Sequence, residues 1–182
     1  MRFAFALTDR RYGVFWQVLQ DTGQFMKTVL FLCTGNYYRS RFAEIYFNWL
    51  AVRHAVPWQA VSRGLALDPA NPGAMSQHTL RWLARREILA DTTQRMPLDL
   101  TEADLHAAQH IVAVKETEHR PLMIERFPAW IDRVEFWHVD DLDCAAPEHA
   151  LPELEQHVAE LLTRLKTSSS WQVTQRSAPT GR

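Results

Sequence analysis

Hydrophobic and polar positions follow two patterns along the chain, one typical of buried strands and one typical of amphipathic helices. Short apolar runs that suit strands occupy residues 28–33, 58–62, 110–114 and 133–137. Apolar residues at helical spacing occupy the segments between and after them, at 41–53, 75–86, 116–126 and 151–165. Strands that alternate with helices in this way predict an α/β fold, in which a parallel sheet carries helices on both faces.

A loop of small and polar residues joins the first predicted strand to the first predicted helix. Its sequence, CTGNYYRS, separates Cys33 from Arg39 by five residues. The carboxyl end of a parallel strand meets the amino end of the next helix at such a loop, where unpaired backbone N–H groups bind anions. Gly35 and Asn36 are residue types that tolerate the left-handed backbone needed to wrap a tetrahedral anion. The pattern therefore predicts a phosphate-binding loop after the first strand.

The side chains of this loop suit nucleophilic chemistry on phosphorus. Cys33 would lie beneath a bound phosphate and attack it as a thiolate, the form that a helix amino terminus and a nearby guanidinium favour. Arg39 offers a planar fork for two phosphoryl oxygens, and Ser40 could donate a hydrogen bond to the Cys33 sulfur. The alternative is a buried cysteine at a strand end followed by a solvated arginine. The glycine, asparagine and serine around the pair favour the phosphate loop.

CTGNYYRS followed by FAE resembles the low-molecular-weight protein tyrosine phosphatase family, whose loop reads C-x-G-N-x-x-R-S. The similarity extends through most of residues 27–165, because AVSRGLALDP and LTEADLHAAQHIVAVKETEHRPLM are similar to later segments of that family. The resemblance implies a four-stranded sheet and hydrolysis of phosphomonoesters, foremost phosphotyrosine in proteins, through a phosphocysteine intermediate. It also implies phosphate binding or loop support by the remaining residues of the loop: Thr34, Gly35, Asn36, Tyr37, Tyr38 and Ser40.

The resemblance further implies a general acid on a late loop, where the family carries an Asp-Pro pair. The corresponding segment, FWHVDDLDC, has no such pair. Counting from the end of the preceding strand, we expect Asp141 to be the general acid, with Leu142 in the place of the proline. Asp140 and then Asp143 are the alternatives, and a solvated acidic turn is the alternative for any one of the three.

Other positions depart from the family pattern. Tyr38 stands where many members carry a second, protective cysteine, and we expect its side chain to be buried, whereas we expect Tyr37 at the rim of the site. The aromatic residues that often follow the Asp-Pro pair are missing, so a smaller or non-aromatic phosphomonoester is an alternative substrate. Arg41 replaces the usual proline and is expected to add positive charge near the mouth of the pocket. Cys144 is the only other cysteine, which argues against the related thioredoxin-coupled arsenate reductases.

Composition predicts one catalytic domain with two flanking segments. A chain of 182 residues with 47% hydrophobic residues can bury a substantial core. We place the catalytic domain at 27–166. Residues 1–26 have no counterpart in the family and are interpreted as an N-terminal extension. The tail at 167–182 is rich in Ser, Thr, Gln and Pro and is predicted to be disordered.

The remaining features limit the partners that we expect. A formal net charge of −1 offers no general attraction to nucleic acid. Two cysteines, no apolar run long enough to span a membrane and no convincing signal peptide predict a cytoplasmic protein. We expect no cofactor, because no dinucleotide or Walker motif is present, and no metal, because His106 and His110 do not share a predicted helix. The alternative to a phosphatase acting on a phosphorylated protein or small phosphomonoester is a phosphate-binding or regulatory module with weak turnover.

Overall fold

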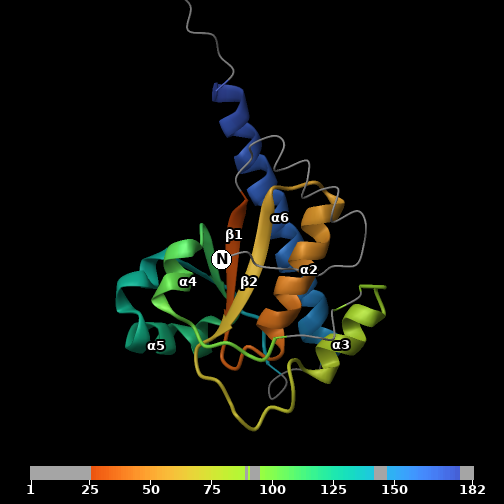
Figure 1. Cartoon of the computed structure of the whole chain (residues 1–182), viewed down its shortest axis with the longest axis vertical. Coiled ribbons are helices and arrows are strands. Elements are labelled where there is room, and N and C mark those ends of the chain that lie inside the picture. The colour runs from red at the N-terminus through yellow and green to blue at the C-terminus, as the bar shows by residue number, and fades with distance from the viewer. Residues whose placement is uncertain (1–25, 89, 91–94, 142–146, 177–182) are drawn as a thin grey trace, which may run out of the picture.

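The computed structural model describes residues 26–88, 90, 95–141 and 147–176 and contains a single four-stranded sheet within them (Figure 1). All its strand pairs are parallel, and the spatial order is β2-β1-β3-β4. The strands are β1 (Lys27–Cys33), β2 (Trp58–Gly64), β3 (His110–Ala113) and β4 (Val134–Phe136). Each lies where the apolar runs predict a strand, which confirms the predicted α/β fold.

Helices cover both faces of this sheet (Figure 1). One face carries α2 (Arg39–Arg53), α3 (Gln77–Ala84) and α6 (Pro147–Arg176). The other carries α4 (Glu102–Ala107), α5 (Glu116–Arg126) and the 3-10 helix η1 (Pro128–Arg133). The hydrophobic pattern predicts α2, α3 and α5 with small shifts at their ends, but it does not predict α4.

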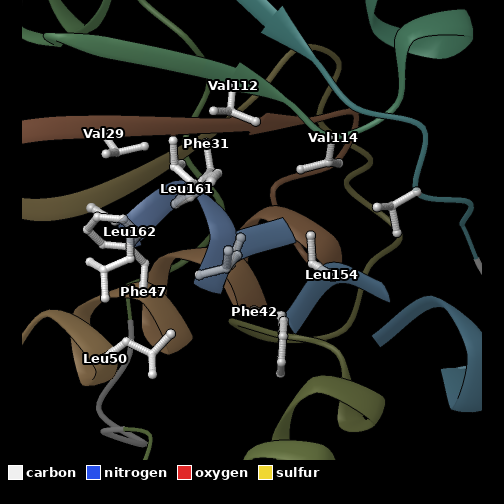
Figure 2. Packing of buried hydrophobic residues seen from close by; sticks show 14 of the residues in the cluster. Val29, Phe31, Phe42, Phe47, Leu50, Val112, Val114, Leu154, Leu161 and Leu162 are labelled. Carbon is white, nitrogen blue, oxygen red and sulfur yellow. The ribbon is translucent and has the colours of Figure 1, made fainter. Parts of the chain in front are cut away.

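Strand β1 connects the two hydrophobic cores because its side chains point alternately to opposite faces. Val29 and Phe31 pack with residues of α2 and α6 (Figure 2). Leu30 and Leu32 pack on the other side with residues of α4 and α5. All four are fully buried, so β1 is a rigid base for the loop that follows it.

Helix α4 begins with a capping box that a sequence can reveal. The hydroxyl of Thr101 accepts a hydrogen bond from the Asp104 backbone N–H at 3.3 Å, and the Asp104 carboxylate accepts one from the Thr101 N–H at 3.0 Å. The T-x-x-D spacing is visible in LTEAD. With six residues, however, the helix is too short for a periodic apolar stripe.

Helix α6 is longer at both ends than the predicted 151–165. The backbone is helical as far as Arg176, and the disorder predicted for the tail at 167–182 stays a prediction. Residues 177–182 and nearly all of the extension at 1–26 lie outside the described residues. None of the helices within the described part combines the length and apolar character that crossing a membrane needs.

Glu135 on β4 holds three neighbours together at the edge of the sheet. Its carboxylate lies 2.9 Å from His110 Nε2 and accepts hydrogen bonds from the Trp137 indole at 2.8 Å and from Arg164 at 2.6 Å. Burial alone would raise the pKa of Glu135, but its bonds to His110, Arg164 and Trp137 outweigh burial and lower the pKa to about 2.

The Glu135 bonds predict a pH-dependent contribution to stability. Because the folded pKa lies below the ordinary value of 4.5, the ionised carboxylate stabilises the fold above that pH, and this contribution is lost as the pH falls towards 2. We expect Glu135→Gln to lower the free energy of unfolding by about 2 kcal/mol at pH 7 and by roughly half of that or less at pH 3, measured by urea denaturation. Glu153→Gln, at a more exposed carboxylate, is the control, and equal losses at both pH values for Glu135→Gln would contradict the prediction.

Candidate active site

The nucleophile loop, residues 33–40, lies at the carboxyl edge of the sheet between β1 and α2. Cys33 is the last residue of β1 and pairs in register with Gly64, the last residue of β2. A Cβ atom at position 64 would lie 2.8 Å from the Thr34 carbonyl oxygen, so only glycine lets β2 run this close to the loop. The Ala66 N–H donates to the same carbonyl at 2.9 Å and fixes the start of the loop.

The sulfur of Cys33 and the hydroxyl of Ser40 lie 2.8 Å apart, and both residues are buried. The contact joins the end of β1 to the first turn of α2. It is the contact that the sequence predicts for a serine that supports a nucleophilic sulfur.

The backbone of the loop presents hydrogen-bond donors. Within the described residues, no N–H group of 34–38 donates a hydrogen bond. Tyr38, at the amino end of α2, provides no side-chain cap. Asn36 has a φ of 49°, the left-handed conformation predicted for this position. Uncapped N–H groups at the start of a helix attract the oxygens of an anion, so the backbone here suits phosphate.

Arg39 is 1% exposed and holds two carboxylates at its outer nitrogens. Its Nη1 and Nη2 donate to Glu118 at 3.2 and 2.7 Å, and Nη2 also donates to Asp141 at 2.5 Å. Burial works to lower the pKa of Arg39, but the bond to Glu118 and the charges of Cys33 and Asp141 raise it, so the guanidinium stays charged. Its buried Nε has no hydrogen-bond partner among the described residues.

The segment after β4 contains two aspartates that the structure describes, and they have different partners. Asp141 bonds to Arg39, whereas Asp140 forms an ion pair with Lys115. Of these two, only Asp141 therefore lies against the arginine of the nucleophile loop. The third candidate, Asp143, lies outside the described residues, as does Cys144.

The two loop tyrosines differ in burial. Tyr38 is buried, as predicted, and its hydroxyl has no hydrogen-bond partner within the described residues. Burial first and the charge of Asp141 second raise its pKa above the ordinary value, so its hydroxyl stays neutral. Tyr37 is half-buried, and its hydroxyl donates to the Pro72 carbonyl at 2.9 Å. Tyr37 thus links the nucleophile loop to the exposed loop that follows β2, and its position at the rim remains a prediction.

Arg41 does not lie at the mouth of the pocket, which corrects the expectation from sequence. Its side chain is buried and its Nη1 donates to Glu44 at 2.8 Å. Residues three apart on a helix are neighbours, so Glu44 meets Arg41 on the buried side of α2. The positive charge therefore lies beneath the loop, and we no longer expect Arg41 to attract acidic substrates.

Sequence reasoning missed Glu118 and a partly buried group around Asn36 formed by Glu44, Ser62 and Arg95. Glu118 lies in the first turn of α5, directly after β3. Because β3 is the neighbour of β1 in the sheet, the start of α5 lies beside the nucleophile loop. The sequence does show a carboxylate shortly after a predicted strand. To place that carboxylate beside the nucleophile loop, however, one must know that β3 is the neighbour of β1.

The described geometry joins a buried thiol, unpaired backbone donors, a charged arginine and a carboxylate at one edge of a parallel sheet. The model of the family described as low molecular weight phosphotyrosine protein phosphatase matches residues 28–170. The chain belongs to this family. No curated protein matches the sequence.

Solved structures of this phosphatase family and related proteins share the fold. YfkJ from Bacillus subtilis is 22% identical with a TM-score of 0.69, and the alignment covers 79% of this chain and 96% of YfkJ. A low molecular weight protein tyrosine phosphatase from Bacillus subtilis is 23% identical with a TM-score of 0.64, covering 77% of this chain and 97% of that protein.

A third similar structure is the YwlE arginine phosphatase from Geobacillus stearothermophilus. It is 20% identical with a TM-score of 0.55, covering 86% of this chain and 99% of that protein. At such identities the likeness shows the fold alone. Membership of the phosphatase family indicates a phosphorylated substrate, while the neighbours include both tyrosine and arginine phosphatases.

Proposed function

We propose that the protein is a cytoplasmic phosphomonoester hydrolase that acts on phosphotyrosine in proteins through a phosphocysteine at Cys33. The observation that carries the proposal is the meeting of Cys33, the N–H groups of 34–38 and the buried Nε of Arg39 at one sheet edge. These donors have no hydrogen-bond partner among the residues that the structure describes. A buried donor without a partner is costly, and phosphoryl oxygens are partners of the right charge.

In the first step, the Cys33 thiolate attacks phosphorus, so that a P–S bond forms and the ester P–O bond breaks. The N–H groups of the loop and Arg39 bind the remaining phosphoryl oxygens and stabilise the charge that they carry in the transition state. Asp141 donates its proton to the leaving oxygen, so the alcohol or phenol departs neutral. Its position against Arg39 supports this role.

In the second step, water attacks the phosphocysteine and the P–S bond breaks. Asp141, now ionised, accepts a proton from that water, and inorganic phosphate is released. The Cys33 sulfur leaves as a thiolate. The Ser40 hydroxyl, 2.8 Å away, supports this departure by hydrogen bonding to the sulfur.

One observation favours the alternative of a phosphate-binding module with weak turnover. Glu118 and Asp141 both bond to Arg39, and carboxylates at this position compete with a phosphoryl dianion for the same guanidinium. Family membership and the set of Cys33, Arg39 and Ser40 support the enzyme more strongly, because a binder has no need of a nucleophile.

Rates of phosphate release from three peptides test the proposal. The peptides share one sequence and carry phosphotyrosine, phosphoserine or phosphoarginine. We expect kcat/KM for phosphotyrosine to exceed the other two by about 10²-fold, because the half-buried Tyr37 favours an aromatic leaving group. Vanadate is expected to inhibit. Binding of vanadate without turnover of any peptide would instead favour the binding module, and faster release from phosphoarginine would overturn the substrate class.

A further inference from the structure

The guanidinium of Arg39 has two pairs of adjacent N–H groups, and the two carboxylates bind to different pairs. Glu118 binds the end pair, with one oxygen on Nη1 at 3.2 Å and the other on Nη2 at 2.7 Å. The remaining Nη2 hydrogen lies on the side of Nε, and Asp141 accepts it at 2.5 Å. The buried Nε has no partner among the described residues. Asp141 is therefore the carboxylate on the pair that still has an unused donor.

A phosphoryl dianion that binds this side pair, Nε and Nη2, takes the place of Asp141. Two adjacent N–H groups match two phosphoryl oxygens, and a dianion attracts them more strongly than a single carboxylate charge does. Glu118 can stay on the end pair and keep the guanidinium in place. The Asp141 carboxyl group then gives up a charged partner, and a nearby donor can replace that bond.

Tyr38 has a buried donor next to Arg39. It directly precedes Arg39, it is 5% exposed, and its hydroxyl has no hydrogen-bond partner among the described residues. Its backbone carbonyl accepts from the Phe42 N–H at 3.0 Å and from the Thr79 hydroxyl at 3.2 Å, which holds the residue in place. An unpaired buried hydroxyl costs free energy, and phenylalanine would fill the same space without that cost. We therefore expect the hydroxyl to find an acceptor in another state of the site.

The charges that act on the Tyr38 hydroxyl indicate that it lies near the acid. Apart from burial, the charge of Asp141 raises its pKa most, and the charge of Glu148 in the first turn of α6 raises it further, while Arg39 lowers it. The segment that carries Asp141 runs along the same arginine, since the Val139 carbonyl accepts from Arg39 Nη1 at 3.1 Å. Tyr38 and Val139 also belong to one hydrophobic core. The hydroxyl thus lies near the segment after β4 and the start of α6.

We propose that Tyr38 is a positioning residue for the general acid: when a phosphoryl dianion takes Arg39, the Tyr38 hydroxyl donates to the displaced Asp141 carboxyl group and holds it at the leaving oxygen. The inference deepens the proposed function, because it concerns the acid of the same site. One carboxyl oxygen accepts from Tyr38, and the other carries the proton for the leaving oxygen. Tyr38 does not touch the reacting atoms in this role.

The same bond favours the proton transfer itself. A hydroxyl donates more strongly to a carboxylate than to a neutral carboxyl group, so the bond strengthens as Asp141 loses its proton. In this step the O–H bond of Asp141 breaks, an O–H bond forms on the leaving oxygen, and the negative charge remains on the carboxylate. Tyr38 keeps its own proton, because burial and the charges of the two carboxylates raise its pKa above the ordinary value.

Calorimetric titration of the full-length protein with inorganic phosphate tests the proposal without turnover. We expect Tyr38→Phe to weaken phosphate binding roughly 3- to 10-fold, because the displaced Asp141 loses its new partner. In an Asp141→Ala background, Tyr38→Phe should leave the phosphate affinity unchanged. Tyr46→Phe is the matched control, since it removes a phenol hydroxyl from α2 on which Glu155 and Arg86 act instead of the acid. The control should bind phosphate as the wild type does.

Rates with two aryl phosphates test the effect on the acid. Tyr38→Phe should lower kcat about tenfold for phenyl phosphate and less than about twofold for p-nitrophenyl phosphate, whose leaving group needs little help from an acid. A residue that only supports the fold would lower both rates alike. If the wild type hydrolyses no phosphate ester, the proposed function fails, and the calorimetric result still decides whether Tyr38 receives Asp141.

Thermal unfolding separates positioning from loss of structure. Phenylalanine keeps the ring and removes only a hydroxyl that is unpaired among the described residues, so the Tm of Tyr38→Phe should not fall. Wild-type phosphate affinity in Tyr38→Phe, or the same weakening with and without the Asp141 carboxylate, would overturn the proposal. So would equal losses of kcat for the two aryl phosphates.

Discussion

Replacement of Cys33 by serine is expected to reduce kcat for p-nitrophenyl phosphate by about 10⁴-fold or more. A serine hydroxyl is not ionised at neutral pH. Among the residues that the structure describes, the side chain bonded to this position is the hydroxyl of Ser40, which is not a general base. Phosphate and vanadate should still bind, because the backbone donors of 34–38 and Arg39 are unchanged. Initial rates give the loss of activity, and calorimetric titration with phosphate gives the binding.

The second cysteine provides the control for this experiment. Cys144→Ser is expected to keep the wild-type rate, since Cys144 has no assigned part in the reaction. Rapid acid quenching of the wild type should trap one phosphate on the peptide that contains Cys33. Cys33→Ser activity within tenfold of the wild type would rule out Cys33 as the nucleophile.

Replacement of Asp141 by asparagine is expected to lower kcat by about 10² to 10³-fold for phenyl phosphate. The loss should be smaller for p-nitrophenyl phosphate, because its weakly basic leaving group needs little help from an acid. Binding of phosphate should tighten, since the variant removes a negative charge that bonds to Arg39. Rates for a series of aryl phosphates with leaving groups of increasing basicity measure this dependence.

Asp140→Asn is the matched control for the acid. Asp140 is adjacent in sequence but pairs with Lys115, so its replacement should change kcat less than threefold, roughly the effect of a surface charge. If Asp140→Asn shows the steeper dependence on the leaving group, the acid has been assigned to the wrong carboxylate. If neither variant does, Asp143 is the remaining candidate.

The sequence predicts the sheet and the nucleophile loop well because their signals are local. A parallel strand buried on both faces needs a continuous apolar run, as in Val29 to Leu32. A loop that wraps an anion needs residues such as Asn36 that adopt a positive φ. Helix α4 has neither a long apolar stripe nor the length to show one, and its cap is the only local signal.

The partners of the catalytic arginine and of Asn36 were not predictable in the same way. Glu118 lies 79 positions from Arg39, and Arg95 lies 59 positions from Asn36. Such pairs meet only after the strand order has placed their segments side by side, and the hydrophobic pattern does not specify that order. The prediction for Arg41 was wrong for a different reason. Its charge suggested a solvated side chain, but an ion pair with Glu44, three residues further along the helix, makes burial possible.

The bond between Arg39 and Asp141 couples phosphate binding to the release of Asp141. A phosphoryl dianion and the Asp141 carboxylate compete for one guanidinium, so each weakens the binding of the other. By thermodynamic reciprocity, binding of the dianion favours displacement of Asp141 from Arg39 to the same degree that this displacement favours binding. Substrate thus frees from Arg39 the carboxyl group that its own leaving group requires.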